Sequence, residues 1–273
     1  MKKISRRSFL AAAAVSAAAL AMTACGGSAS SAASSVASSA AASSGAAALS
    51  TVLAGKLTMA TNATFPPYEM TTDSGEIEGI DVDTAKAIAE KLGLELQVDD
   101  MEFDAALLSV QQGKADIVMA GVTVTDERKA VMDFSDSYAT GIQSIIVPND
   151  SDIASPDDLA GKKIGTQRGT TGYIYCSDDF GEDSVVAYDS GLTAVQALNN
   201  GQVDAVVIDN APATQYVAAN PGLKVLDTSY AEEDYAIGMA KGSALEDAIN
   251  KALEELKEDG TLQSIVDKYI NAN

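Results

Sequence analysis

Short apolar runs alternate with stretches of helical hydrophobic spacing along most of the chain. The runs at 57–60, 94–98 and 117–120 have the length and apolar content of buried strands. Over 82–92 and 103–112, apolar residues recur every three or four positions and a glycine follows, as it does after many helices. Further strands are predicted at 163–166 and 203–208, and further helices at 192–198, 211–219, 244–257 and 261–270. This alternation predicts an α/β fold of mostly parallel sheets with helices on both faces.

One local pattern occurs twice. In each copy a helix ends in glycine, an aspartate follows three residues later, and an apolar strand begins directly after it. The copies are Gly113 with Asp116 and Gly201 with Asp204, about 88 residues apart. Because the pattern repeats, it predicts two similar α/β lobes. Ligands of such sheets bind beyond the carboxyl ends of the strands, so two facing lobes would form a cleft.

The first 24 residues are predicted to be an export signal. Basic residues precede an apolar run at 10–21, which is shorter than the roughly 20 residues of a membrane span. The segment 22–25 resembles a bacterial lipobox, in which Cys25 carries lipid and begins the mature chain. The segment 5–10 also resembles a twin-arginine signal, so twin-arginine and general secretory export both stay open. A plain N-terminal membrane anchor is the weaker alternative.

A low-complexity segment follows the predicted lipid site. Residues 26–48 contain only Gly, Ser, Ala and Val, a composition that cannot build a core and behaves as a flexible linker. The linker is therefore assigned to 25–53, including the lipidated cysteine. Lipid on Cys25 would anchor the folded body to the outer face of the bacterial cell membrane.

Charge and composition exclude several classes of function. The 273 residues include 39 Asp and Glu against 18 Lys and Arg, a net charge of −21. Nucleic acid is not expected as a partner, because phosphate binding needs clustered Lys and Arg. The chain has no His and only two Cys, which excludes His-based triads and Cys-rich zinc sites. No paired-carboxylate motif is visible either, so no metal, cofactor or catalytic residue is expected.

Four segments, taken in order and spacing, resemble the extracytoplasmic solute-binding proteins of family 3, which serve polar amino-acid ABC transporters. The first is Ala-Thr-Asn-Ala-Thr-Phe-Pro-Pro-Tyr-Glu at 60–69, and the second is Gly-Ile-Asp-Val-Asp at 79–83. The third is Ala-Gly-Val-Thr-Val-Thr-Asp-Glu-Arg-Lys at 120–129, followed by Asp-Phe-Ser at 133–135. The fourth is Asp-Leu-Ala-Gly-Lys-Lys-Ile-Gly at 158–165, with Gly-Thr-Thr-Gly at 169–172. The resemblance runs from about Lys56 to Ile270.

The resemblance implies a two-lobed, type II periplasmic-binding-protein-like fold with two parallel-rich sheets and a ligand cleft between the lobes. Lobe one would comprise 54–140 plus 236–273, and lobe two 141–235, with strands crossing near 140–146 and 234–239. It further implies a monomer that closes on a free amino acid by hinge motion. The partners would be an ABC permease and its ATPase.

The family pattern places the ligand carboxylate on Arg128, Thr123 and Gly121. Carboxylates suit the planar fork of a guanidinium and free backbone amides, and free amides are expected after the strand that ends at Ala120. The alternative for Arg128 is a surface helix position that pairs with Asp126 or Glu127, in a helix that Thr125 could cap.

By the same resemblance, Asp209 binds the ligand ammonium, because it follows an apolar strand of the second lobe. Its alternative role is a helix cap, and both roles could hold. Thr170 and Thr171 match positions that donate to the carboxylate, and Gln167 is a plausible contact of the ligand side chain. The alternative for these three residues is simple turn chemistry in a Gly-Thr-Thr-Gly loop.

Three more positions match the family's ligand contacts. Phe65 and Phe103 correspond to aromatic residues that sandwich the ligand, although a phenylalanine is more often core. Asn62 stands where family members often carry an acid. A buried cationic ligand head would then lack its counter-charge, so Asn62 favours a neutral polar ligand such as glutamine or cystine. The competing functions are an exported dehydratase-like enzyme and a ligand-sensing module with the same fold.

Overall fold

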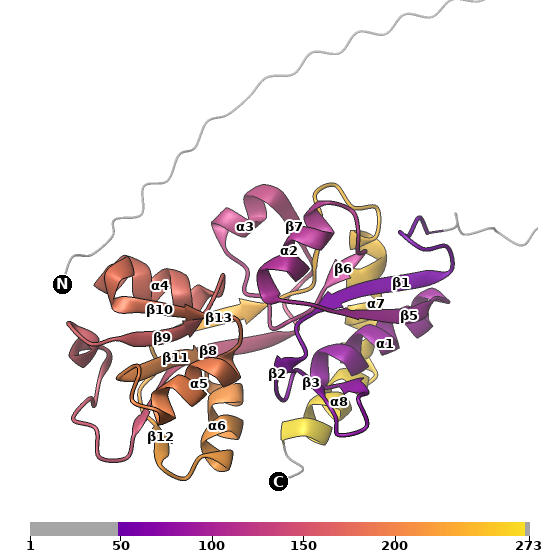
Figure 1. The fold of residues 1–273 in the computed structure, drawn as a ribbon. Helices are drawn as coiled ribbons and strands as arrows, with labels where there is room; N and C mark the ends of the chain where they lie inside the picture. The colour runs from indigo at the N-terminus through magenta and orange to yellow at the C-terminus, as the bar shows by residue number, and fades with distance from the viewer. Residues whose placement is uncertain (1–48, 271–273) are drawn as a thin grey trace, which may run out of the picture. The chain divides into compact units, whose positions relative to one another are not determined.

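The chain forms two large mixed sheets within residues 49–270, the part described by the computed structural model (Figure 1). The predicted signal peptide, Cys25 and the linker up to residue 48 lie outside this part. The first sheet has the order β5-β1-β6-β14-β7. Its strands are β1 (Lys56–Thr61), β5 (Glu95–Asp100), β6 (Ile117–Val118), β7 (Met132–Phe134) and β14 (Gly238–Ala240). β1 is parallel to β5 and β6, whereas β14 is antiparallel to β6 and β7.

The second large sheet has the order β10-β9-β11-β8-β12, and β13 also pairs with β8. β9 is parallel to β10 and β11, while β8 is antiparallel to β11, β12 and β13. The strands are β8 (Ala139–Pro148), β9 (Ile164–Gln167), β10 (Val185–Tyr188), β11 (Ala205–Asp209), β12 (Leu223–Val225) and β13 (Ala231–Tyr235). Both sheets are thus more mixed than the strand–helix alternation predicts, because several strands follow one another without an intervening helix.

Helices connect the parallel strands, and all six helices predicted from hydrophobic spacing are present with small shifts in their bounds. A small antiparallel sheet of β2 (Thr64–Phe65), β3 (Glu69–Thr71) and β4 (Ile77–Glu78) precedes the first helix. The α-helices are α1 (Ile80–Leu92), α2 (Phe103–Gln111), α3 (Asp126–Val131), α4 (Thr171–Phe180), α5 (Gly191–Asn199), α6 (Asn210–Ala219), α7 (Glu246–Glu258) and α8 (Thr261–Ile270). Two short 3₁₀ helices are η1 (Pro156–Leu159) and η2 (Glu182–Ser184).

The chain passes between the two large sheets twice. It leaves the first sheet after β7 and enters the second with β8, and it returns from β13 to β14. A β-bridge between Thr123 and Tyr235 joins the start of the α3 segment to this return path. The lobe boundaries given above remain a prediction.

The repeated glycine–aspartate pattern has the same local geometry in both sheets. Gly113 and Gly201 follow their helices with φ of 67° and 66°, a left-handed conformation that favours glycine. The Asp116 carboxylate then accepts the Thr58 amide of β1 at 2.8 Å. The Asp204 carboxylate accepts the amide of Lys163, directly before β9, at 2.7 Å. Each aspartate therefore ties its own strand to the start of a parallel neighbour.

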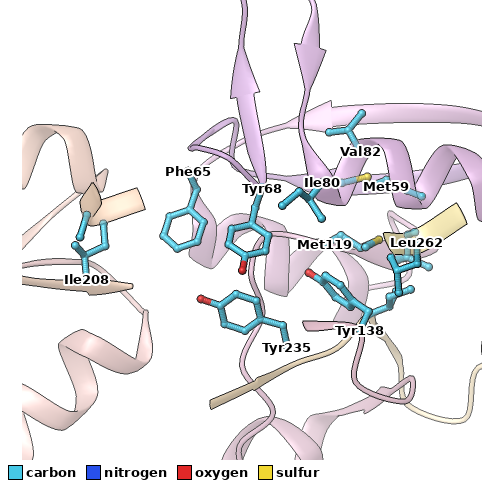
Figure 2. Packing of buried hydrophobic residues seen from close by; sticks show 14 of the residues in the cluster. Met59, Phe65, Tyr68, Ile80, Val82, Met119, Tyr138, Ile208, Tyr235 and Leu262 are labelled. Carbon is cyan, nitrogen blue, oxygen red and sulfur yellow. The ribbon is translucent and has the colours of Figure 1, made fainter. Parts of the chain in front are cut away.

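Buried aromatic residues lie beside the path between the sheets. Figure 2 shows the rings of Phe65, Tyr68 and Tyr235 close to one another. The centroids of Phe65 and Tyr68 are 6.0 Å apart, and those of Tyr68 and Tyr235 are 5.3 Å apart in an edge-to-face arrangement. Such pairs stabilise a core beyond their buried area.

Within 49–270, no helix combines the length and apolar character that crossing a bilayer requires.

Candidate functional site

A small cavity is lined by residues from the segments around both large sheets. Its wall includes all ten positions predicted to contact a ligand. These positions are Asn62, Phe65, Phe103, Gly121, Thr123, Arg128, Gln167, Thr170, Thr171 and Asp209. The wall also includes Glu69, Ala120, Gln143 and Ile208, which the sequence analysis did not select. The fold therefore brings together residues that are up to about 150 positions apart in the sequence.

Arg128 is the cation of this wall. Thr125 caps α3 by accepting the Arg128 amide at 3.2 Å, as the sequence suggested. The side chain is only 8% exposed, and its guanidinium donates to the carbonyl oxygens of Thr123 at 2.7 Å and Gly169 at 3.2 Å. The guanidinium carbon lies 5.4 Å from the centroid of the Phe103 ring. The alternative of an exposed surface arginine is therefore wrong. Burial lowers the pKa of Arg128, and nearby acids oppose that shift.

Asp209 is a buried acid on the same wall, at the end of β11. Its carboxylate accepts the Tyr235 hydroxyl and, at 2.8 Å, the Gln143 side-chain amide. It occupies the N-cap position of α6, but its side chain accepts no amide of that helix. The helix-cap role is therefore not performed by the carboxylate. Burial raises the pKa of Asp209 to about 7, while the hydrogen bonds from Tyr235 and Gln143 oppose the rise.

The hydroxyl groups near Arg128 are only partly free. Thr123 donates its hydroxyl to a Glu233 oxygen at 3.1 Å and lies 3.5 Å from the Thr171 hydroxyl. The Gly121 amide was expected to be free, but it donates to Asp81 at 2.9 Å. Asp81 lies in the first turn of α1, so the sequence around the strand end at Ala120 does not reveal this acceptor. Gly121 therefore lines the cavity with its backbone, and its amide is already bound.

Asn62 and Gln167 connect the two sides of the cavity. The Gln167 side-chain amide donates to the Asn62 side-chain oxygen at 2.9 Å, and Asn62 donates to the Met101 carbonyl at 2.8 Å. Thr170 performs the turn chemistry that was its alternative role, because it caps α4 through the Tyr173 amide at 3.3 Å. It lines the cavity as well.

Phe65 and Phe103 are core residues that also line the cavity, while their contact with a ligand stays a prediction. Both side chains are buried members of hydrophobic clusters, and both also line the cavity. Gly121, opposite Phe65, has φ of 55°, and a Cβ atom there would lie 2.8 Å from the Phe65 ring. Glycine therefore permits the close approach of this ring to the cavity wall.

Glu69 is the most consequential residue that sequence reasoning missed. Its side chain is fully buried, and neither carboxylate oxygen receives an N–H or O–H donor from the described residues. Burial and the neighbouring Asp81 raise its pKa well above the usual value. Glu69 therefore adds an ionisable acid to the cavity wall, which the expectation of a neutral ligand from Asn62 alone left out. The residue follows the Phe-Pro-Pro-Tyr segment directly, so its place in the sequence could have indicated it.

Gln143 and Glu233 were also missed, because they lie within strands rather than at strand ends. Gln143 in β8 donates to Asp209 at 2.8 Å and to Glu233 of β13 at 2.9 Å. These contacts form a buried polar network beside the cavity.

In residues 49–270, no group of three or more metal-ligating side chains is arranged to hold an ion.

A family model for "Bacterial extracellular solute-binding proteins, family 3" matches residues 57–272. The chain belongs to this family. A probable histidine-binding protein of Neisseria gonorrhoeae is 36% identical over 219 residues, which cover 77% of this chain and 81% of that protein. The L-cystine-binding protein of Escherichia coli K12 is 32% identical over 223 residues, or 80% of this chain and 84% of the relative.

Solved structures agree with this assignment. An ancestral arginine-binding protein bound to glutamine is 42% identical with a TM-score of 0.75, covering 80% of this chain and 99% of that chain. Another, bound to arginine, is 44% identical with the same TM-score, covering 79% and 98%. The relatives are amino-acid-binding proteins of ABC importers, and the two-lobed α/β fold is confirmed. Family members are solute-binding proteins and not enzymes, so the dehydratase-like alternative is set aside.

Proposed function

We propose that this protein captures a free polar L-amino acid in the cavity and delivers it to the permease and ATPase of an ABC importer. One observation carries the proposal: a buried cation, Arg128, and a buried acid, Asp209, lie on the wall of one cavity. Isolated buried charges are costly, so a pair of opposite sign around a polar cavity suits a zwitterion. A free amino acid presents a carboxylate and an ammonium at one carbon.

The carboxylate of the ligand binds Arg128 in this proposal. Two backbone carbonyls hold the guanidinium in place, and they leave part of its five-donor fork for a further acceptor. The Thr171 hydroxyl adds a donor at the same end of the cavity. The Thr123 hydroxyl, 3.5 Å away, becomes a further donor when it exchanges its Glu233 acceptor for the ligand. Thr170 lines the same wall.

The ammonium binds Asp209. Tyr235 and Gln143 donate to this carboxylate and thereby hold its orientation. Phe65 and Phe103 supply the apolar walls between the two charged ends. This arrangement leaves Asn62, Gln167 and Glu69 for the side chain of the ligand.

The chemistry of these last three residues favours a ligand side chain that ends in N–H donors. A neutral amide such as that of glutamine can donate to the Gln167 side-chain oxygen, since the Asn62 oxygen already accepts from Gln167 and Thr64. Cystine is a further neutral polar candidate. Glu69 supports a second candidate, a cationic head such as that of arginine, because a buried carboxylate without a donor suits a guanidinium. The relatives bound to glutamine and to arginine agree with both candidates.

Closure of two lobes around the ligand completes the proposed mechanism. The proposed lobes are 54–140 with 236–273, and 141–235. Hydrogen bonds from Gln167 to Asn62 and from Arg128 to Gly169 join them. Because ligand would add contacts to both lobes, it would shift the equilibrium towards the closed form, which is the form that the permease would recognise.

We further propose export to the outer face of the cell membrane as a monomer anchored by lipid on Cys25. This part rests on the sequence pattern at 22–25. Mass spectrometry of the N-terminal peptide from membranes tests it. A diacylglyceryl group on Cys25 is the expected result, and a free thiol there contradicts it.

Isothermal titration calorimetry tests amino-acid capture. The protein is first unfolded and refolded to remove bound ligand, and is then titrated with L-glutamine, L-cystine and L-arginine. We expect at least one of them to saturate one site per chain. A protein that binds none of the three and no other amino acid contradicts the proposal.

A further inference from the structure

Two carboxyl groups, those of Glu69 and Asp81, are fully buried on neighbouring segments, because the Asp81 amide donates to the Tyr68 carbonyl at 2.9 Å. Glu69 lines the cavity. The Asp81 carboxylate accepts the Gly121 amide at 2.9 Å and the Tyr138 hydroxyl at 2.7 Å. Glu69 receives no such donor from the described residues, and neither of its oxygens has a hydrogen-bond partner. Keeping two neighbouring buried carboxyl groups ionised together is costly, so one of them is expected to hold a proton.

Glu69 is the group that carries this proton. Asp81 already has two hydrogen-bond donors, which favour its charged form. Glu69 is equally buried but has no donor, so burial favours its protonated form. The side chains that act on the charge of Glu69 are acids and therefore disfavour ionisation: Asp81 on α1, Asp209 on β11 and Asp100 on β5. Tyr68, Tyr138 and Tyr216 also face Glu69, and all three phenols stay neutral because burial raises their pKa values.

Resting on the proposed function, we propose that Glu69 and Asp81 share one proton while the cavity is empty, and that a cationic ligand head displaces this proton to solvent. A neutral amide head leaves the proton in place and binds to the protonated pair. In the exchange, the O–H bond of Glu69 breaks, the proton passes to the buffer, and the ligand cation takes over the neutralisation of the pair. The subsite thereby adapts its charge to the ligand, which allows one cavity to bind amino acids of either charge.

The test measures protons released on binding at pH 8 by calorimetry in phosphate and in Tris, buffers with different ionisation enthalpies. At this pH, Asp209 has ionised before the ligand arrives, because its pKa is about 7. We expect L-arginine to release about one proton per site, and L-glutamine to release close to none. The ratio of arginine to glutamine affinity should also rise by up to tenfold per pH unit.

Glu69→Gln is the informative variant, because the amide has the shape of the protonated acid and can donate to Asp81. We expect the ratio of its L-arginine affinity to its L-glutamine affinity to fall at least tenfold relative to the natural protein. The remaining L-arginine binding should release no proton. Glu78→Gln, on the neighbouring strand β4 and outside the cavity wall, is the matched control and should behave like the natural protein.

Infrared spectroscopy of the ligand-free protein gives a reading that does not depend on the ligand. A protonated carboxylic-acid C=O band should be present at pH 8 in the natural protein and in Glu78→Gln, and absent from Glu69→Gln. Absence of the band, arginine binding without proton release, or failure of every cationic amino acid to bind each overturns the proton exchange. Failure of all amino acids to bind would instead contradict the proposed function, so the two failures are distinguishable.

Discussion

Arg128 is buried, but its guanidinium donates to backbone carbonyls rather than to a carboxylate. Carbonyl oxygens carry only partial charge, so the guanidinium keeps its affinity for a full anion. Asp209 is held in the same manner by neutral donors, Tyr235 and Gln143. At the scale of single residues, the site is therefore a set of oriented groups with incomplete hydrogen-bond partners, as the proposed binding of a zwitterion requires.

Arg128→Ala should weaken amino-acid binding by about 100-fold or more, because it removes the buried donor fork for the carboxylate. The measurement is calorimetric titration with the best ligand. Arg168→Ala is the matched control, since the Arg168 side chain is 53% exposed, and it should bind normally. If Arg128→Ala keeps a native circular dichroism spectrum and full affinity, the carboxylate assignment is wrong.

Asp209→Asn should weaken binding about 30-fold or more, because the ammonium loses its counter-charge. In the natural protein, the affinity for a neutral amino acid should also fall as the pH drops below 7. Burial raises the Asp209 pKa to about 7, and the protonated form offers no charge to the ammonium. Titrations at pH 5 and pH 8 check this. An unchanged affinity in the variant moves the ammonium contact elsewhere.

The cavity residues divide into those that the sequence could predict and those that it could not. Arg128 lies in a recognisable motif and Asp209 ends an apolar strand, so their positions could be predicted. Gln143 could not, because it lies in the middle of a ten-residue strand, and its alignment with Asp209 depends on the antiparallel register of β8 and β11. The occupied amide of Gly121 was likewise unpredictable, since its acceptor Asp81 is 40 positions away.

At the scale of elements, the helix predicted at 261–270 coincides with α8, and the other five predicted helices lie within two residues of the observed bounds. The small sheet β2–β4 was missed because its strands contain only two or three residues. The strand predicted at 117–120 is only Ile117–Val118. The chain leaves the sheet there to reach Gly121, whose left-handed φ of 55° turns it towards the cavity wall. The functional loops thus shorten the elements that the sequence predicts.

Gly79 links β4 to α1, and through α1 it positions Asp81. Its φ of 141° and ψ of 179° are open only to glycine, and a Cβ atom would lie 2.1 Å from the Tyr68 carbonyl oxygen. Gly79→Ala should therefore lower the free energy of unfolding by about 3 kcal/mol or more. The measurement is urea unfolding of the ligand-free protein.

Gly75→Ala is the matched control for this prediction. Gly75 has φ of 84°, but a Cβ atom there meets nothing within 4 Å. The Gly75→Ala substitution should lower the free energy of unfolding by only about 1 kcal/mol, which is the cost of a left-handed conformation. Equal losses in the two variants would mean that the steric contact with Tyr68 does not decide the stability of this turn.

At the scale of the whole molecule, buried acids affect stability as well as binding. Burial raises the pKa of Asp81 to about 6 and that of Asp209 to about 7. The folded protein therefore holds protons that the unfolded chain has released, so the free energy of unfolding falls as the pH rises from about 4 to about 7. Each group contributes a slope of up to about 1.4 kcal/mol per pH unit.

Urea unfolding of the ligand-free protein between pH 4 and pH 8 checks this trend. Asp209→Asn should show a shallower decline, because it removes one of the groups. Stability that rises across this range would contradict the raised pKa values of the buried acids.

The general plan of the molecule, two α/β units with repeated helix-to-strand turns, could be predicted from the sequence alone. The mixed character of the sheets could not, because it arises where the chain crosses between them through β8 and β14 without a helix. These crossings place Gln143 and Glu233 beside the cavity. The crossings that local sequence patterns do not predict therefore form part of the site.

The most direct test of amino-acid capture is a dye-based thermal shift of the refolded protein against all twenty amino acids, cystine and common polyamines. Binding to the folded state raises the melting temperature by mass action. We predict that one or a few polar amino acids raise it, and that Arg128→Ala abolishes the rise. A melting temperature that no amino acid changes, or an equal rise in Arg128→Ala, would contradict the account.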